Sequence, residues 1–165
     1  MRILGIDPGF ERLGIAVVER TASAQGFGAP KKEKVIFSEC FKTSSKLDFG
    51  ERLSLIGERV GEIIKKYKPE LLSIETLFLN TNQKTAMRVA EARGVIIYEA
   101  ARARLQIFEA TPLQIKVATT GYGRADKVQV MKMVKILVEI EELKKSDDEL
   151  DAIAIALTAF AHKRI

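Results

Sequence analysis

The first hydrophobic run of the chain, Ile3 to Ile6, has no polar residue alternating with it, and Asp7, Pro8 and Gly9 follow it at once. A continuous apolar run of this length is typical of a strand that is buried on both faces, in the middle of a sheet. Proline and glycine then end the strand in a turn. The pattern predicts a central strand with the Asp7 carboxylate at its end, either as an ordinary turn former or as a ligand for a metal or a phosphate.

Two further β-rich runs follow, at residues 13–20 and 35–42, and the segment 21–34 between them is polar. Their short spacing predicts an antiparallel meander with an exposed hairpin tip. Beyond them, helical periodicity alternates with short apolar runs. Asp48 and Glu51 form a capping-box pattern, and Pro69 follows that helix.

The remaining elements expected from this alternation are a fourth strand at 71–75, a long helix at 83–104, a fifth strand at 105–109, and three helices beginning at Thr111, at Val128 and at Ser146 or Asp147. A strand–helix–strand unit of this length implies parallel pairing. We therefore predict a single α/β domain over residues 1–165, in which a mixed sheet of three antiparallel and two parallel strands has helices on both faces.

Composition narrows the class of protein. The chain has 165 residues, 47% hydrophobic and 30% charged, which describes a soluble domain. A single cysteine, Cys40, leaves no internal disulfide framework and suits a reducing compartment such as the cytoplasm. No apolar run is long enough to span a bilayer, so no membrane association is expected. The net charge of +5 favours a polyanionic partner.

The candidate chemistry lies in carboxylates at the ends of buried elements. Glu75, like Asp7, ends an apolar strand, and adjacent parallel strands would bring the two together. Asp148 and Asp151 are three residues apart at the start of an apolar helix, on one face. Asp147 is four residues from Asp151, so spacing alone does not choose between Asp147 and Asp148.

Structural explanations exist for each acid separately, since acidic residues suit the first turn of a helix and polar residues suit strand ends. Four converging carboxylates, however, would repel one another without a cation. Two Mg²⁺ ions would balance their charge, and paired Mg²⁺ ions are suited to in-line phosphodiester displacement. The only histidine, His162, lies near the C-terminus, which disfavours a zinc site.

Five motifs in order give the chain a recognisable family resemblance: Ile3–Gly9, Ile74-Glu75 with Phe78, Glu91–Gly94, Gly121–Lys127 and Asp148–Ala156. The set resembles the RuvC family of bacterial Holliday-junction resolvases over nearly the whole chain. The resemblance implies an RNase H-like fold, a homodimer and Mg²⁺-dependent symmetric nicking of four-way DNA junctions in recombination and repair. The expected products are a 5′-phosphate and a 3′-hydroxyl.

The same resemblance implies that Asp7, Glu75, Asp148 and Asp151 are the metal ligands, and so favours Asp148 over Asp147. Similarity to RNase H-like nucleases implies that Asp7 bridges two Mg²⁺ ions, for which Mn²⁺ could substitute. It also implies that Asp148 and Asp151 hold the metal that activates water, and that Glu75 helps to hold the metal beside the leaving 3′ oxygen.

DNA contacts are implied for residues on both sides of the glycine loop. Lys116, as a catalytic residue, and Lys127 would approach the scissile phosphate, and Phe78 would stack on an unpaired base at the junction centre. Solvated lysines and a buried phenylalanine are the structural alternatives. Further candidates for DNA contacts are Lys84, Arg88, Tyr122 and Arg124.

Two cuts in a nearly two-fold symmetric junction require two sites, so an isologous dimer is expected. A stripe of small residues on the long helix would permit close approach of a partner, or would simply contact the sheet: Ala86, Ala90, Gly94 and Ala101. Branch-migration proteins are expected as further partners.

The chain differs from the family pattern in two places. One is its long basic connection, Gly26–Lys34, which either contacts DNA or has no role, and the other is its short C-terminus.

Three other functions are compatible with parts of the pattern. A different RNase H-like nuclease would act on hybrids or single strands, but the glycine loop and the motif order disfavour it. An actin-like ATPase needs two lobes, for which 165 residues leave little room. A junction-binding module without catalysis would gain nothing from four carboxylates.

Overall fold

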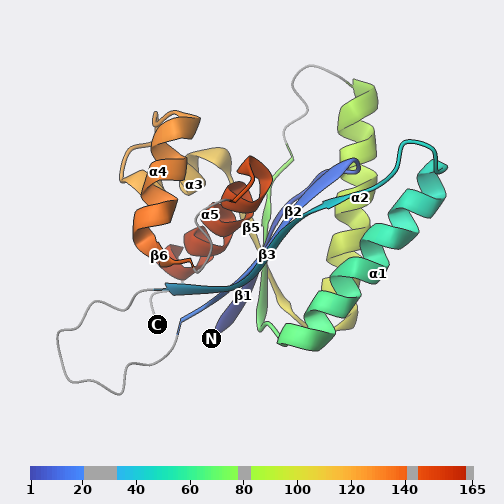
Figure 1. The fold of residues 1–165 in the computed structure, drawn as a ribbon, viewed down its shortest axis with the longest axis horizontal. Coiled ribbons are helices and arrows are strands. Elements are labelled where there is room, and N and C mark those ends of the chain that lie inside the picture. The colour runs from blue at the N-terminus through green and yellow to red at the C-terminus, as the bar shows by residue number, and fades with distance from the viewer. Residues whose placement is uncertain (21–32, 78–82, 141–144, 163–165) are drawn as a thin grey trace.

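The fold is a β-sheet with helices on both faces (Figure 1). This computed structural model describes residues 1–20, 33–77, 83–140 and 145–162. The strands are β1 (Arg2–Asp7), β2 (Arg12–Glu19), β3 (Glu33–Lys42), β4 (Leu71–Glu75), β5 (Gln106–Ala110) and β6 (Val138–Glu139). The helices are α1 (Phe49–Tyr67), α2 (Gln83–Arg102), α3 (Pro112–Thr120), α4 (Lys127–Leu137) and α5 (Asp147–His162).

The sheet has the order β5-β4-β1-β2-β3-β6. Strands β1, β2 and β3 are antiparallel, whereas β4 runs parallel to β1 and β5 parallel to β4. The predicted α/β fold and its mixed sheet are confirmed. Within the described ranges the sheet has one strand more than expected. The helix expected to end at Val138 ends at Leu137, and Val138 pairs with Glu33 in the two-residue strand β6, which is too short to show periodicity.

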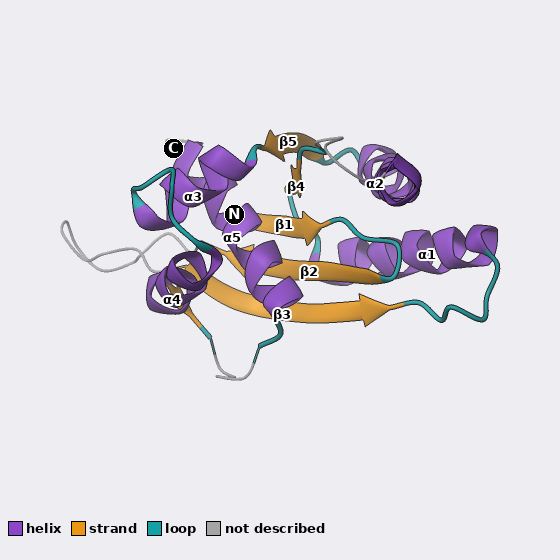
Figure 2. Cartoon of the chain, turned by 90° about the horizontal axis from the view of Figure 1, so that it is seen from above, coloured by secondary structure: helices purple, strands orange, loops and turns teal. Residues whose placement is uncertain are grey.

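Side chains of the central strands alternate between two hydrophobic cores. Ile3 of β1 belongs to the core beneath α5, whereas Leu4 and Ile6 belong to the core beneath α1 and α2. These three side chains are fully buried, as expected for a strand covered on both faces. Both views show α3, α4 and α5 grouped on one side of the molecule and α1 and α2 on the other (Figure 1 and Figure 2).

The ends of the helices follow their capping residues. Asp48 and Glu51 form the predicted capping box of α1, and Thr111 caps α3 ahead of a proline. Of the two candidates for α5, it is Ser146 whose hydroxyl accepts the backbone N–H of Glu149, while the Glu149 carboxylate accepts the Ser146 N–H. None of the described helices combines the length and apolar composition that crossing a membrane requires.

Helix α2 contacts the rest of the protein through a different face from its small-residue stripe. Ala92, Ile96 and Ala100 are buried, whereas Ala90 and Gly94 of the stripe are exposed. The stripe is therefore available on the surface, and contact with the sheet does not explain it.

Candidate active site

Strand alternation directs Asp7 and Glu75 toward helix α5. In β1, Ile3 and Asp7 are four residues apart, so they share the face that α5 covers. In β4, the hydroxyl of Ser73 donates to the backbone carbonyl of Ile155 in α5 at 2.7 Å, and Glu75 is two residues further along the same face. The two strands are adjacent and parallel, so both carboxylates lie at the same edge of the sheet.

Two glycines allow α5 to lie directly on the sheet above these strands. A Cβ atom on Gly5 of β1 would lie 2.2 Å from the carbonyl oxygen of Ala152, and one on Gly14 of β2 would lie 2.2 Å from that of Asp148. Only a residue without a side chain permits so close an approach. The first turns of α5, which carry Asp148 and Asp151, are thereby held beside Asp7.

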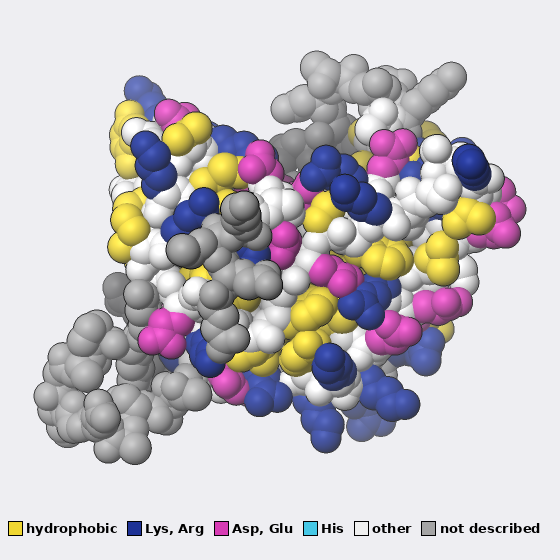
Figure 3. Space-filling view, in the orientation of Figure 1, with side chains coloured by type: hydrophobic (Ala, Val, Ile, Leu, Met, Phe, Trp, Pro, Cys, Tyr) yellow, Lys and Arg dark blue, Asp and Glu magenta, His cyan; other side chains and the backbone are white. Residues whose placement is uncertain are grey.

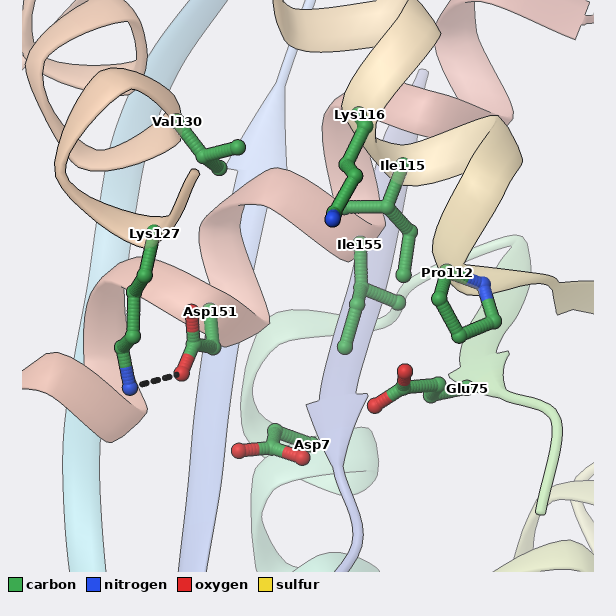
Figure 4. A pocket seen from close by; sticks show the side chains of 9 residues that line it. All are labelled: Asp7, Glu75, Pro112, Ile115, Lys116, Lys127, Val130, Asp151 and Ile155. Atoms are coloured by element: carbon green, nitrogen blue, oxygen red, sulfur yellow. Dashed lines mark ion pairs between the residues drawn. The ribbon is translucent and has the colours of Figure 1, made fainter. Parts of the chain in front are cut away.

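The acids and two lysines meet in one cavity of about 260 Å³. Figure 4 shows Asp7 at the end of β1, with Glu75 on one side of it and Asp151 on the other. The residues that line the cavity are Asp7, Glu75, Pro112, Ile115, Lys116, Lys127, Val130, Asp151 and Ile155. Three predicted metal ligands and two predicted phosphate contacts are thus brought together from β1, β4, α3, α4 and α5.

The three carboxyl groups of this cavity have raised pKa values, because they are buried and repel one another when ionised. Burial, with repulsion from Asp151 and Asp148, raises the pKa of Asp7 to about 6. Burial, with repulsion from Asp7 and Asp151, raises the pKa of Glu75 to about 7. Burial also raises the pKa of Asp151, although its contact with Lys127 opposes the shift. A site with this excess of negative charge favours cations.

Lys127 enters the cavity from the first residue of α4. Its ammonium group lies 3.0 Å from a carboxylate oxygen of Asp151 and 3.7 Å from one of Asp147. Burial would lower the pKa of Lys127, but the hydrogen bond and charge of Asp151 raise it overall. Lys127 is therefore a charged group paired with the acids, although 55% of its side chain is exposed.

Asp148 does not line the cavity, and its side chain pairs with residues of β2 and β3. Its Oδ2 atom accepts an ion-paired hydrogen bond from the Arg12 guanidinium and a contact from the Cys40 thiol at 3.3 Å. Burial would raise the pKa of Asp148, but the hydrogen bonds from Cys40 and Arg12 lower it overall. Asp147 is more exposed, at 68% of its side chain against 22% for Asp148.

Arg12 was not among the predicted site residues. The period-two pattern of β2 places Arg12 on the face of Gly14, Ala16 and Val18, and the last two of these belong to the core beneath α5. The sequence contains that pattern, but the pairing that brings β2 under Asp148 appears only in the folded sheet.

Of the remaining predicted DNA contacts, the three that the structure describes do not line the cavity: Arg88, Tyr122 and Arg124. Tyr122 and Arg124 are exposed on the loop between α3 and α4, where Gly121 adopts a left-handed φ of 73°. Arg88 of α2 pairs with Glu91 and stacks on the ring of Phe49. Phe78, the side chain of Lys84 and most of the basic connection 26–34 lie outside the described residues.

The donor set suits hard divalent cations. Its members are carboxylate oxygens, and His162 lies near the other end of α5, against Phe108. Among the described residues, no three Asp, Glu, His or Cys side chains are gathered as they stand into a group that could hold a metal ion. Of the four carboxylates, Asp148 is paired with Arg12 and Asp151 with Lys127. The repulsion between Asp7, Glu75 and Asp151 is of the kind that Mg²⁺ relieves.

Comparison with known proteins identifies the chain's relatives. Residues 3–159 match the family model described as crossover junction endodeoxyribonuclease RuvC. Proteins of that name from Halothermothrix orenii and Alkaliphilus metalliredigens are 45% and 46% identical over 157 residues, which is 95% of this chain and 90% and 91% of theirs.

A solved structure of T. thermophilus RuvC in complex with a Holliday junction substrate superposes with a TM-score of 0.89 at 31% identity, over 99% of this chain and 95% of that one. The yeast mitochondrial Holliday junction resolvase Ydc2, at 16% identity and a TM-score of 0.70, shares the fold. The sequence match, the structural match and the edge-of-sheet acids agree, and the chain belongs to the RuvC family of crossover junction endodeoxyribonucleases.

Proposed function

We propose that this protein resolves four-way DNA junctions in recombination and repair by nicking two strands symmetrically, leaving 5′-phosphate and 3′-hydroxyl ends. The observation that carries the proposal is the meeting of three acids with raised pKa values and two lysines in one cavity. Such a cavity binds cations and phosphate oxygens together, as hydrolysis of a phosphodiester requires.

Asp7, Glu75, Asp148 and Asp151 would hold two Mg²⁺ ions, or Mn²⁺ in their place. When bound, the ions supply the positive charge that stabilises the attacking and leaving oxygens of an in-line displacement. Asp7 is the central residue of the set, since its charge couples to both Asp148 and Asp151 and it also raises the pKa of Glu75. Loss of Asp7 therefore affects every other acid of the site.

The two lysines bind the phosphate on the open side of the acids. Lys116 reaches the cavity from α3, and Lys127 reaches it from α4 (Figure 4). A lysine ammonium is a compact charge with rotatable donors, which suits non-bridging phosphate oxygens. Both lysines would orient the scissile phosphate beside Asp7.

The DNA path beyond the cavity follows the exposed loop with Tyr122 and Arg124. Figure 3 shows basic and acidic side chains intermixed over one face of the molecule, so the net charge of +5 does not form a single basic patch on that face. Lys84, Arg88 and Phe78 stay predictions as additional DNA contacts.

A second copy of the chain would bind along α2. Met87 and Tyr98 are 64% and 59% exposed on this helix, and the exposed residues Ala90 and Gly94 lie between them at helical spacing. Large apolar side chains beside small ones suit a self-complementary helix contact. Sedimentation at assay concentration should show a dimer, and a monomer alone would contradict it. Branch-migration proteins in the cytoplasm of a bacterial cell are the proposed further partners.

A cleavage assay tests the proposal. A four-way junction labelled on each strand should be cut with Mg²⁺ at paired positions in opposite strands, whereas a linear duplex should stay intact. Asp7→Asn should bind the junction and leave it uncut. Equal cleavage of an RNA–DNA hybrid or a single strand would favour a different nuclease of this fold.

A further inference from the structure

The pairing of Arg12 with Asp148 follows from the register of three strands. Gly14 of β2 pairs with Asp7 of β1 on one side and with Cys40 of β3 on the other. Because Gly14 has no side chain, the backbone of Asp148 lies directly above it. Arg12 is two residues from Gly14 on the same face of β2, so its guanidinium reaches the Asp148 side chain.

One oxygen of Asp148 receives both donors. Arg12 Nη2 and Cys40 Sγ both contact Oδ2, so that oxygen is directed toward β2 and β3. The three other acids direct their carboxylates into the cavity shown in Figure 4, which Asp148 does not line. Asp148 therefore pairs with the Arg12 guanidinium on one side, and its charge still reaches the acid-lined cavity, where it acts on Asp7.

Arg12 contacts only Oδ2 of Asp148, but a guanidinium and a divalent cation on the same carboxylate group repel each other even when they contact different oxygens. We propose that Arg12 is a positioning residue that competes with Mg²⁺ for the Asp148 carboxylate, so that the metal affinity of the site depends on release of Asp148 by Arg12. The inference rests on the proposed metal site. It assigns to Arg12 a role in metal binding that is separate from contact with DNA.

Removal of Arg12 should change the Mg²⁺ affinity only slightly, but the direction of the change distinguishes competition from structural support. The Arg12 side chain is 55% exposed, and ion pairs at exposed positions are weak. Removing Arg12 should therefore tighten Mg²⁺ binding by roughly two- to fivefold, the range that corresponds to such a pair. A residue that only supports the fold of the site would, when removed, weaken metal binding or leave it unchanged.

Calorimetric titration of the full-length, metal-free protein with Mg²⁺, in the absence of DNA, measures this directly, and Mn²⁺ with detection of free ion by electron paramagnetic resonance repeats it. Arg12→Ala and Arg12→Gln should both bind the ions more tightly, and Arg12→Lys should lie closer to wild type. Arg2→Ala is the matched control. Arg2 and Glu19 form a similarly exposed pair between β1 and β2, at the end of these strands that is farther from Asp7.

A double-variant cycle separates competition from a general effect of charge. In an Asp148→Asn background, the further change Arg12→Ala should leave the metal affinity unaltered. The role of Arg12 would be overturned if Mg²⁺ binding tightened equally in the Asp148→Asn background or in Arg2→Ala. It would also be overturned if neither Arg12→Ala nor Arg12→Gln bound Mg²⁺ more tightly than the wild type. If the wild-type protein cleaves junctions but Arg12→Ala binds metal no more tightly, the inference alone fails; if the wild type binds no metal, the proposed function fails with it.

Discussion

Arg93 of α2 donates a hydrogen bond from Nε to the backbone carbonyl of Glu75 at 3.1 Å. The same guanidinium pairs through Nη2 with Glu109 of β5, and it is largely buried, with 16% of its side chain exposed. Arg93 thus ties the helix that carries the proposed dimer surface to the strand end that presents Glu75. The bond acts on the opposite side of the sheet from α5, so the Glu75 side chain stays available to the cavity.

Removal of this bond should impair cleavage more than DNA binding. We expect Arg93→Ala to lower the cleavage rate at saturating junction by roughly 10- to 100-fold, because catalytic groups tolerate only small displacements. Arg93→Lys should lose less activity. Single-turnover cleavage and a gel-shift affinity measure the two effects. Glu109→Gln leaves the bond to Glu75 in place and is the control; an equal loss in that variant would show that Arg93 acts only through Glu109.

The raised pKa values of the cavity acids predict a pH-dependent cost in stability. With folded pKa values of about 6 for Asp7 and about 7 for Glu75, the folded protein binds more protons than the unfolded chain, so stability falls as pH rises from about 4 to about 7. Asp7→Asn and Glu75→Gln should each stabilise the metal-free protein by roughly 1–3 kcal/mol at pH 8, and by clearly less at pH 4.

Urea unfolding with a chelator present, at pH 4 and pH 8, measures this difference. Asp147→Asn removes an exposed carboxylate from the start of the same α5 helix, outside the cavity, and is the control variant. A gain in stability of equal size at both pH values would mean that the substitutions act through side-chain contacts and not through charge.

The acids at the strand ends could be predicted because the hydrophobic pattern of each strand also shows where that strand ends. Asp7 and Glu75 each follow an apolar run, and short buried strands in an α/β chain pair in parallel with their ends together. The choice between Asp147 and Asp148 was different, since helical spacing allowed both. Their burial differs only after α5 is docked on Gly14, which is a property of the packed sheet, and the choice of Asp148 as the ligand stays a prediction.

The contacts of Arg12 and Arg93 could not be predicted from sequence, for a related reason, although Arg93 lies within the motif Glu91–Gly94. Each acts on a residue far away along the chain, Arg12 on Asp148 and Arg93 on Glu75. Hydrophobic periodicity tells which face of an element is buried, but it does not tell which polar side chain crosses to a neighbouring element. That information depends on strand register and helix placement, which arise from tertiary packing.

The close contact at Gly14 predicts a severe effect of a very small substitution. A Cβ atom there would lie 2.2 Å from the Asp148 carbonyl oxygen and 3.2 Å from the Asp7 Cβ. Helix α5 would have to move away from the sheet, so Gly14→Ala should destabilise the protein by about 3 kcal/mol, the upper end of the usual range for overpacking. Gly61→Ala in α1 meets only an ordinary contact at 3.5 Å and should be neutral or stabilising. Thermal unfolding compares them, and equal melting temperatures would contradict the docking of α5 on Gly14.

Lys127 must exchange one partner for another if it binds phosphate, since in the free protein its ammonium group lies 3.0 Å from Asp151. Lys127→Ala should weaken junction binding and lower the slope of log affinity against log salt by about one unit, because one counterion-releasing contact is lost. Lys132→Ala, an exposed lysine on the same helix that does not line the cavity, is the matched control and should change the slope less. Asp151→Asn should act in the opposite direction and tighten binding, because it frees Lys127 and removes a negative charge from the DNA path. An unchanged slope in Lys127→Ala would leave Lys127 with a single role, that of holding the Asp151 carboxylate in place.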